Sequence, residues 1–161
     1  MVTVDNSKSI KIDIYTPEDE KALIALVTAV LAEHNFEFDQ KLDADMYNIR
    51  EAYINGGGLF FVVKDGKKVV GCAGIRRISG ELAELRRIYL LSKYRGSGVG
   101  RMLVEGALNF CREKKYEKVV LDTTERNTAA MALFTKLGFK VVKQVGEKIF
   151  LEMKLGSPQA E

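Results

Sequence analysis

The segment YLLSKYRGSGVGRML, residues 89–103, limits the possible folds more than any other stretch of the chain. It combines a strand-like end, three glycines at alternate positions (Gly96, Gly98 and Gly100) and, from Val99 to Leu103, the start of an apolar helical pattern. Glycine leaves backbone N–H groups accessible, and a helix N-terminus carries partial positive charge. The segment therefore predicts a strand, a loop that binds phosphate, and a helix.

Two familiar phosphate-binding loops do not match this segment. A Walker A loop needs Lys and then Ser or Thr after its last glycine, whereas Gly100 is followed by Arg101 and Met102. A dinucleotide fingerprint needs glycine at its sixth position, which here is Arg101, and belongs in the first βαβ unit. The remaining pattern is an arginine followed by Gly-x-Gly-x-Gly, RGSGVG at residues 95–100, between a long hairpin strand and a helix.

The order of strand and helix patterns predicts one α/β domain over residues 1–156, followed by a flexible tail at 157–161. Thr16 and Pro17 mark the start of the first helix, and Gly138 marks the end of the last. We expect strands at residues 10–15, 59–65, 67–78, 81–91, 118–124, 140–145 and 148–155, and helices at 16–36, 43–54, 99–114 and 127–138.

The strand at residues 81–91 contains a change of phase. Ala83 and Leu85 alternate with polar residues, and so do Ile88 and Leu90, but the second pair is shifted by one position. An extra residue at Arg86–Arg87, a β-bulge, would keep both pairs on the buried face and would free backbone groups for a ligand. The alternative is a strand buried on both faces, in which the phase carries no information.

Composition and charge exclude several classes of protein. A net charge of +3 with dispersed basic residues does not favour nucleic acid as a partner. Cys72 and Cys111 lie in apolar patterns and have no second ligand at metal spacing, so we expect buried thiols and no metal. Because no secretory leader or bilayer-spanning apolar run is present, we expect no membrane association and a cytoplasmic location.

At the glycine segment and the strand before it, the sequence resembles the GNAT superfamily of acyl-CoA-dependent N-acyltransferases. The similarity extends from about residue 9 to residue 155 and rests on LRRIYLLSKYRGSGVGRMLVEGAL and NTAAMALFTKLGF, at the family's spacing and in its order of elements. The resemblance implies a mixed, mostly antiparallel seven-stranded sheet with a bulged fourth strand, flanked by about four helices. It also implies an enzyme of the EC 2.3.1 type that moves the acetyl group of acetyl-CoA directly to a primary amine of a small molecule or peptide.

The resemblance further implies how acetyl-CoA is held. Backbone amides of the glycine segment would bind the pyrophosphate at the helix N-terminus, and the pantetheine arm would pair with residues 88–90, in the gap before residues 118–124. Asn127 would contact the cofactor from the following helix, or would only cap that helix. The expected contacts are Ile88, Tyr89, Leu90, Arg95, Gly96, Ser97, Gly98, Val99, Gly100, Arg101, Asn127 and Phe134.

Catalysis by direct transfer needs a base for the ammonium, an oxyanion donor and a proton for the departing thiolate. A backbone N–H near Ile88–Tyr89 is the expected donor. Glu84 is the first candidate for the base and Glu81 the second, although Glu84 is equally compatible with a surface ion pair. The family usually has a tyrosine acid where this chain has Phe134. Either the thiolate leaves unaided, water supplies the proton, or another hydroxyl such as Tyr89 does.

The acceptor is the least defined part of the sequence reading. Arg86 and Arg87 are candidates to hold a carboxylate on a small amino-acid-like acceptor, while a protein N-terminus, a lysine side chain and a polyamine stay open. The absence of the tyrosine at Phe134 also leaves open a non-catalytic acyl-CoA-binding or sensing module. We expect a monomer or a homodimer.

Overall fold

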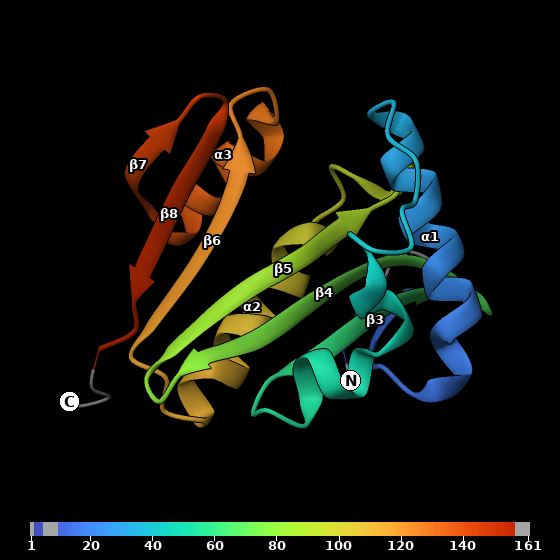
Figure 1. Cartoon of the computed structure of the whole chain (residues 1–161), viewed down its shortest axis with the longest axis horizontal. Coiled ribbons are helices and arrows are strands. Elements are labelled where there is room, and N and C mark those ends of the chain that lie inside the picture. Colours follow the sequence, from blue (N-terminus) through green and yellow to red (C-terminus); the bar gives the residue numbers. More distant parts are fainter. Residues whose placement is uncertain (1, 5–9, 157–161) are drawn as a thin grey trace.

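The computed structural model describes residues 2–4 and 10–156, and their strands form one eight-stranded sheet with helices on both faces (Figure 1). The order across the sheet is β1-β2-β3-β4-β5-β6-β8-β7. All seven expected strands are present, and the short β1 adds an eighth that the sequence reading missed. The expected tail at residues 157–161 lies outside the described residues. The strands are β1 (Val2–Val4), β2 (Ile10–Ile14), β3 (Leu59–Asp65), β4 (Lys68–Ser79), β5 (Leu82–Leu90), β6 (Lys118–Thr124), β7 (Lys140–Val145) and β8 (Lys148–Lys154).

In the described part of the chain, three α-helices and four short irregular helices cover the sheet. Helix α1 lies on one face together with η2 and η3, and α2 and α3 lie on the other (Figure 1). Both cysteines are fully buried, as expected: Cys72 in the core on the α1 side and Cys111 in the core on the α2 side. The helices are η1 (Pro17–Asp19), α1 (Glu20–Glu33), η2 (Ala44–Tyr47), η3 (Arg50–Ile54), η4 (Ser92–Tyr94), α2 (Val99–Glu113) and α3 (Thr128–Leu137).

The sequence predicted one regular helix at residues 43–54, and this prediction is wrong. The chain forms the 3₁₀ helix η2 and the π-helix η3, separated at Asn48, whose φ of −140° and ψ of 48° are not helical. The apolar residues of the segment are nevertheless buried: Met46, Ile49 and Tyr53 are each at most 2% exposed. Burial of these three side chains holds the segment against the sheet.

The sheet is antiparallel except between β5 and β6, which confirms the mixed, mostly antiparallel arrangement. Parallel pairing of β5 with β6 joins only residues 82–84 to residues 118–120. Beyond that point the two strands diverge, as Figure 1 shows. The later part of β5 therefore has β4 on one side and no paired strand on the other.

The predicted β-bulge is present in β5. Cys72 of β4 pairs with Tyr89 and Gly74 pairs with Arg86, so two residues of β5, Arg87 and Ile88, stand opposite a single residue of β4. Arg87 has a φ of +57°, a left-handed conformation that is uncommon outside glycine. Because of the extra residue, the apolar side chains before and after it face α2 together, which is what the phase change predicted.

Candidate functional site

The glycine loop connects η4 to α2 and is shaped by two left-handed residues. Gly96 has a φ of +80°, and Gly98, which directly precedes α2, has a φ of +90°. A Cβ atom added at either glycine would meet no heavy atom within 4 Å. Glycine is therefore required here for its backbone conformation, and the surface around the two residues is open.

The first turn of α2 presents backbone N–H groups at this loop. The Met102 N–H donates to the Gly98 carbonyl at 3.1 Å and makes the first helical hydrogen bond. The N–H groups of Val99, Gly100 and Arg101 precede it and have no carbonyl partner within the helix. With the partial positive charge of the helix N-terminus, these three amides form an anion-binding geometry at the place that the sequence predicted.

The side chains of the loop bind mainly to the chain itself. Arg95 donates through Nε to the Leu90 carbonyl at 2.8 Å and pairs with Glu33 of α1 at 2.8 Å. The Ser97 hydroxyl donates to the Tyr94 carbonyl at 2.8 Å. Arg95 thus fixes the loop against the end of β5 and against α1. Arg101 is half exposed and pairs with a glutamate one turn later in α2.

Backbone N–H groups of β5 lie on the strand edge that faces away from β4, where β5 and β6 have diverged. The Leu91 N–H donates to the Val70 carbonyl of β4 at 2.9 Å, and the Tyr89 N–H faces the Cys72 sulfur. Successive N–H groups of a strand point to opposite edges, so those of Ile88 and Leu90 point away from β4. These two residues have the backbone orientation that pairing with an extended ligand requires.

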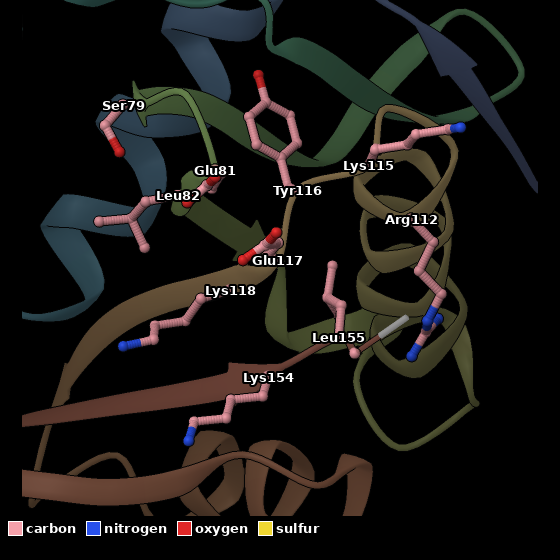
Figure 2. Close-up of a pocket in the computed structure, with 11 residues that line it drawn as sticks. Ser79, Glu81, Leu82, Arg112, Lys115, Tyr116, Glu117, Lys118, Lys154 and Leu155 are labelled. Carbon is pink, nitrogen blue, oxygen red and sulfur yellow. The ribbon is translucent and has the colours of Figure 1, made fainter. Parts of the chain in front are cut away.

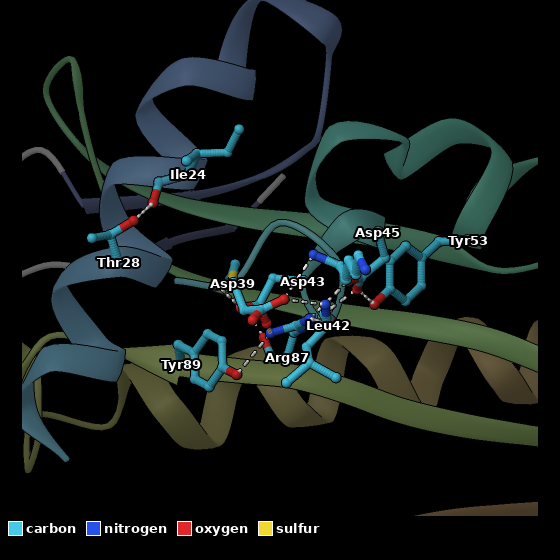
Figure 3. A network of polar contacts seen from close by, with 11 residues as sticks. Ile24, Thr28, Asp39, Leu42, Asp43, Asp45, Tyr53, Arg87 and Tyr89 are labelled. Atoms are coloured by element: carbon cyan, nitrogen blue, oxygen red, sulfur yellow. Dashed lines mark hydrogen bonds and ion pairs between the residues drawn. The ribbon is translucent and has the colours of Figure 1, made fainter. Parts of the chain in front are cut away.

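Arg87 is the centre of a buried polar network on the α1 side of the bulge (Figure 3). Its guanidinium lies 2.9 Å from Asp43 and 2.7 Å from Asp45, and Nη1 donates to the Tyr89 hydroxyl at 3.3 Å. The side chain of Arg87 is 8% exposed, that of Asp43 10% and that of Asp45 13%. Tyr53 donates to Asp45 from the next helix. The network thus joins the segment before η3 to the bulge.

The pKa values of the network keep it ionised. Burial alone would raise the pKa of Asp45, but hydrogen bonds from Arg87 and Tyr53 outweigh burial and lower it below its ordinary value. Burial alone would lower the pKa of Arg87, and the hydrogen bond to Asp45 raises it instead. Because the guanidinium is occupied by the chain's own carboxylates, the expectation that Arg87 holds a carboxylate of the acceptor is wrong.

Glu84 and Tyr89 lie on the same face of β5, because the bulge adds one residue between them. Glu84 pairs with Arg76 of β4, and Tyr89 pairs with Cys72, an even number of residues away along β4. The Glu84 carboxylate accepts from the Arg76 guanidinium at 2.8 Å and is 18% exposed. Burial raises the pKa of Tyr89, although Arg87 acts in the opposite direction. The Tyr89 hydroxyl therefore keeps its own proton at neutral pH.

Comparison with known proteins shows the family of the chain. The model of the Acetyltransferase (GNAT) family matches residues 24–139, a range that contains the bulged strand, the glycine loop and α3. The chain belongs to the GNAT family. Over 112 residues, 66% of this chain, it is 34% identical to N-acetyltransferase 8B of Homo sapiens. The chain spans about half the length of the curated relatives it matches, 49% in that case.

Solved structures share the GNAT fold over nearly the whole chain. An acetyltransferase from Streptococcus agalactiae superimposes with a TM-score of 0.84 at 26% identity, covering 92% of this chain and 100% of the other. The PaiA N-acetyltransferase from Thermoplasma acidophilum, solved in complex with coenzyme A, gives a TM-score of 0.72 at 22% identity over 91% and 99% of the two chains. The predicted GNAT fold is therefore confirmed.

Two residues of the second GNAT motif take structural positions. Asn127 caps α3, because its side-chain oxygen accepts from the Ala130 N–H at 3.1 Å, while its amide nitrogen carries donors that the cap does not use. Phe134 is 4% exposed and packs edge-on against Phe139 with 5.7 Å between ring centroids. Phe134 thus contributes to the core between α3 and the sheet, and it has no hydroxyl to donate.

A hollow of this GNAT chain lies at the other end of β5 (Figure 2). It is lined by the β4–β5 turn, the end of α2 and the start of β6, whereas the glycine loop follows the last residue of β5. Glu81 lines this hollow and is exposed, so it lies a strand's length from the loop. That position favours Glu84 over Glu81 as the base.

Within the described residues, no cluster of acidic, histidine or cysteine side chains is arranged to bind a metal ion. The described helices also include none that is both long and apolar enough to cross a bilayer.

Proposed function

We propose that this GNAT protein is an N-acetyltransferase that moves the acetyl group of acetyl-CoA to a primary amine of a small molecule or a peptide. The observation that carries the proposal is the adjacency of three elements: the open glycine loop, the free amides of α2 and the edge of β5 beyond its divergence from β6. The names of the relatives and the coenzyme A bound by the PaiA protein support the same conclusion.

The residues present fit acetyl-CoA. The amides of Val99, Gly100 and Arg101 would hold the pyrophosphate, and the open surface at Gly96 and Gly98 leaves room for it. Ile88 and Leu90 would pair with the pantetheine arm through the backbone groups that point away from β4. When bound, acetyl-CoA supplies an activated thioester carbonyl that an amine attacks directly.

In our proposal, three groups of β5 assist this attack. The Ile88 N–H is the oxyanion donor in our proposal, because the Tyr89 N–H is turned to Cys72. Glu84 accepts the proton of the ammonium, directly or through water, while Arg76 holds the carboxylate in place. The Tyr89 hydroxyl, held by Arg87, donates the proton that Phe134 cannot.

The test combines binding with turnover. A thermal-shift panel of CoA thioesters should show stabilisation by acetyl-CoA that rises as RT ln(1 + [L]/Kd), and an amine library should then release free CoA thiol. Stabilisation without turnover on any amine would favour the second candidate, a non-catalytic acyl-CoA sensor, which the missing hydroxyl at Phe134 motivates. No stabilisation by any thioester would contradict both functions.

A further inference from the structure

The adjacent arginines Arg86 and Arg87 have opposite environments. Arg87 is bound by Asp43 and Asp45 as described above. Arg86 makes no ion pair or side-chain hydrogen bond among residues 2–4 and 10–156. The nearest acid along the strand, Glu84, is already paired with Arg76. Arg86 is thus a cation without an ion-pair or hydrogen-bond partner in the part of the chain that the structure describes.

The side of the sheet on which Arg86 lies is known from its partner in β4. Arg86 pairs with Gly74, and a Cβ atom on Gly74 would come within 2.8 Å of the Tyr53 ring. Arg86 therefore lies on the α1 side, and its positive charge acts on Tyr53 and Asp45. On the same side, Glu84 precedes it by two residues and Tyr89 follows the bulge.

Arg86 is a half-buried residue whose charge has no ion pair in the described part of the chain, and burial of an arginine without a paired anion costs free energy. Such an arrangement is favourable when a ligand supplies the anion, because arginine binds a carboxylate through two parallel hydrogen bonds. Arg86 lies between Glu84, the proposed base, and Tyr89, the proposed acid. An anion bound to Arg86 would therefore lie beside the reacting amine. At about 3.3 Å per residue, Glu84 and Arg86 are roughly 7 Å apart along the strand.

We propose that Arg86 binds a carboxylate of the acceptor, and that the acceptor is therefore an amino acid or a close analogue, with its amine directed toward Glu84. This inference rests on the proposed function. It adds a specificity-determining residue and a substrate class to that function. The competing explanation within the chain is that Arg86 offsets the second negative charge of the Asp43, Asp45 and Arg87 network.

The experiment compares amino acids with the amines that differ from them only by loss of the carboxylate. The pairs are L-phenylalanine with phenethylamine, L-leucine with isoamylamine, and L-lysine with cadaverine. We expect the parent protein to acetylate the amino acid of at least one pair with the higher kcat/KM. Arg86→Gln should lower kcat/KM for that amino acid about 10- to 100-fold, as expected for lost charge-assisted hydrogen bonds, and for its decarboxylated partner by less than about threefold.

Two further variants separate recognition from structure. Arg86→Lys should recover part of the loss on the amino acid, because it keeps the charge without the two parallel donors. Arg77→Gln is the matched control: it removes an exposed arginine of β4 opposite Ala83 and should leave both members of the pair unchanged. Equal losses on both members with Arg86→Gln, or a parent protein that prefers the amine without a carboxylate, would overturn the proposal.

A binding measurement keeps this inference separate from the proposed function. Calorimetry with N-acetyl-L-phenylalanine and N-acetylphenethylamine does not depend on turnover. Binding of the former that is at least about tenfold tighter, and that Arg86→Gln abolishes, would support a carboxylate site even if no amine were acetylated. Equal binding of the two compounds would overturn it, whatever the catalytic assays show.

Discussion

Replacing Arg87 should destabilise the fold more than any other single change of charge in β5. Arg87→Met keeps an apolar chain of similar length but removes the guanidinium that pairs with Asp43 at 2.9 Å and with Asp45 at 2.7 Å. Both carboxylates are then left nearly buried without their ion-pair partner. The neighbouring change Arg86→Met removes the same group from a residue without an ion pair in the described chain and serves as the control.

The magnitude follows from this burial. Removing one partner of a buried ion pair lowers the free energy of unfolding by about 3–5 kcal/mol. For a chain of this size each kcal/mol corresponds to roughly 2–4 °C in Tm, so Arg87→Met should lower Tm by at least about 6 °C. Arg86→Met should change stability by no more than about 1 kcal/mol. Adding Asp43→Asn and Asp45→Asn to Arg87→Met should recover most of the loss.

The effect should also depend on pH. The hydrogen bonds from Arg87 and Tyr53 outweigh burial and lower the pKa of Asp45 in the folded chain. A depressed carboxyl pKa stabilises the fold above the pKa of the unfolded chain, about 3.9, and this contribution is lost as pH falls through the folded value. The difference in the free energy of unfolding between the parent and Arg87→Met should therefore be largest at pH 7 and become smaller below about pH 4.

Urea unfolding at pH 7, followed by circular dichroism, measures the difference, with thermal melts from pH 3 to pH 8 for the pH dependence. A loss of less than about 1 kcal/mol for Arg87→Met, or an equal loss for Arg86→Met, would refute the reasoning. So would a triple variant that is less stable than Arg87→Met alone.

Four further predictions concern the proposed site. Tyr89→Phe should lower kcat about 10²-fold if Tyr89 is the acid, and a change of only a few-fold would leave the thiolate departing unaided or through water. Because burial raises the pKa of Tyr89 above that of free tyrosine, kcat/KM should rise with pH to a plateau and show no fall near neutral pH. A fall near neutrality would contradict the assigned acid. Glu84→Gln should lower the rate most at low pH, where the ammonium form dominates, and a uniform loss would argue against a base. Asn127→Ala should lower the free energy of unfolding by about 0.5–2 kcal/mol through loss of the cap, whereas Asn127→Asp should retain it.

Local signals predicted much of the fold and of the candidate site. The glycines at positions 96 and 98 act through their own backbone angles, and the phase change in β5 is a property of neighbouring residues. Each of these two signals depends on only a few consecutive residues. The loop, the start of α2 and the bulge could therefore be predicted without knowledge of their neighbours in space.

The Arg87 network could not be predicted in this way. Arg87 and Asp45 are 42 positions apart in the sequence, and their contact depends on how η2 packs against the sheet. A regular helix was expected for residues 43–54 because the spacing of apolar residues is helical, but that spacing says nothing about where the aspartates point. The only signal in the sequence was an Asp-x-Asp pair at residues 43–45 at the start of a predicted helix, where acids are common.

The central claim, that acetyl-CoA binds at the glycine loop, is tested most directly by calorimetric titration of acetyl-CoA into three proteins. They are the parent, Gly98→Glu and Gly146→Glu. Gly146 is the matched control because it also has a positive φ, +60°, and open space around it, but lies in the β7–β8 turn. The account predicts binding to the parent and to Gly146→Glu, and none to Gly98→Glu, whose carboxylate would lie where the pyrophosphate belongs. Equal affinity of all three proteins would contradict it.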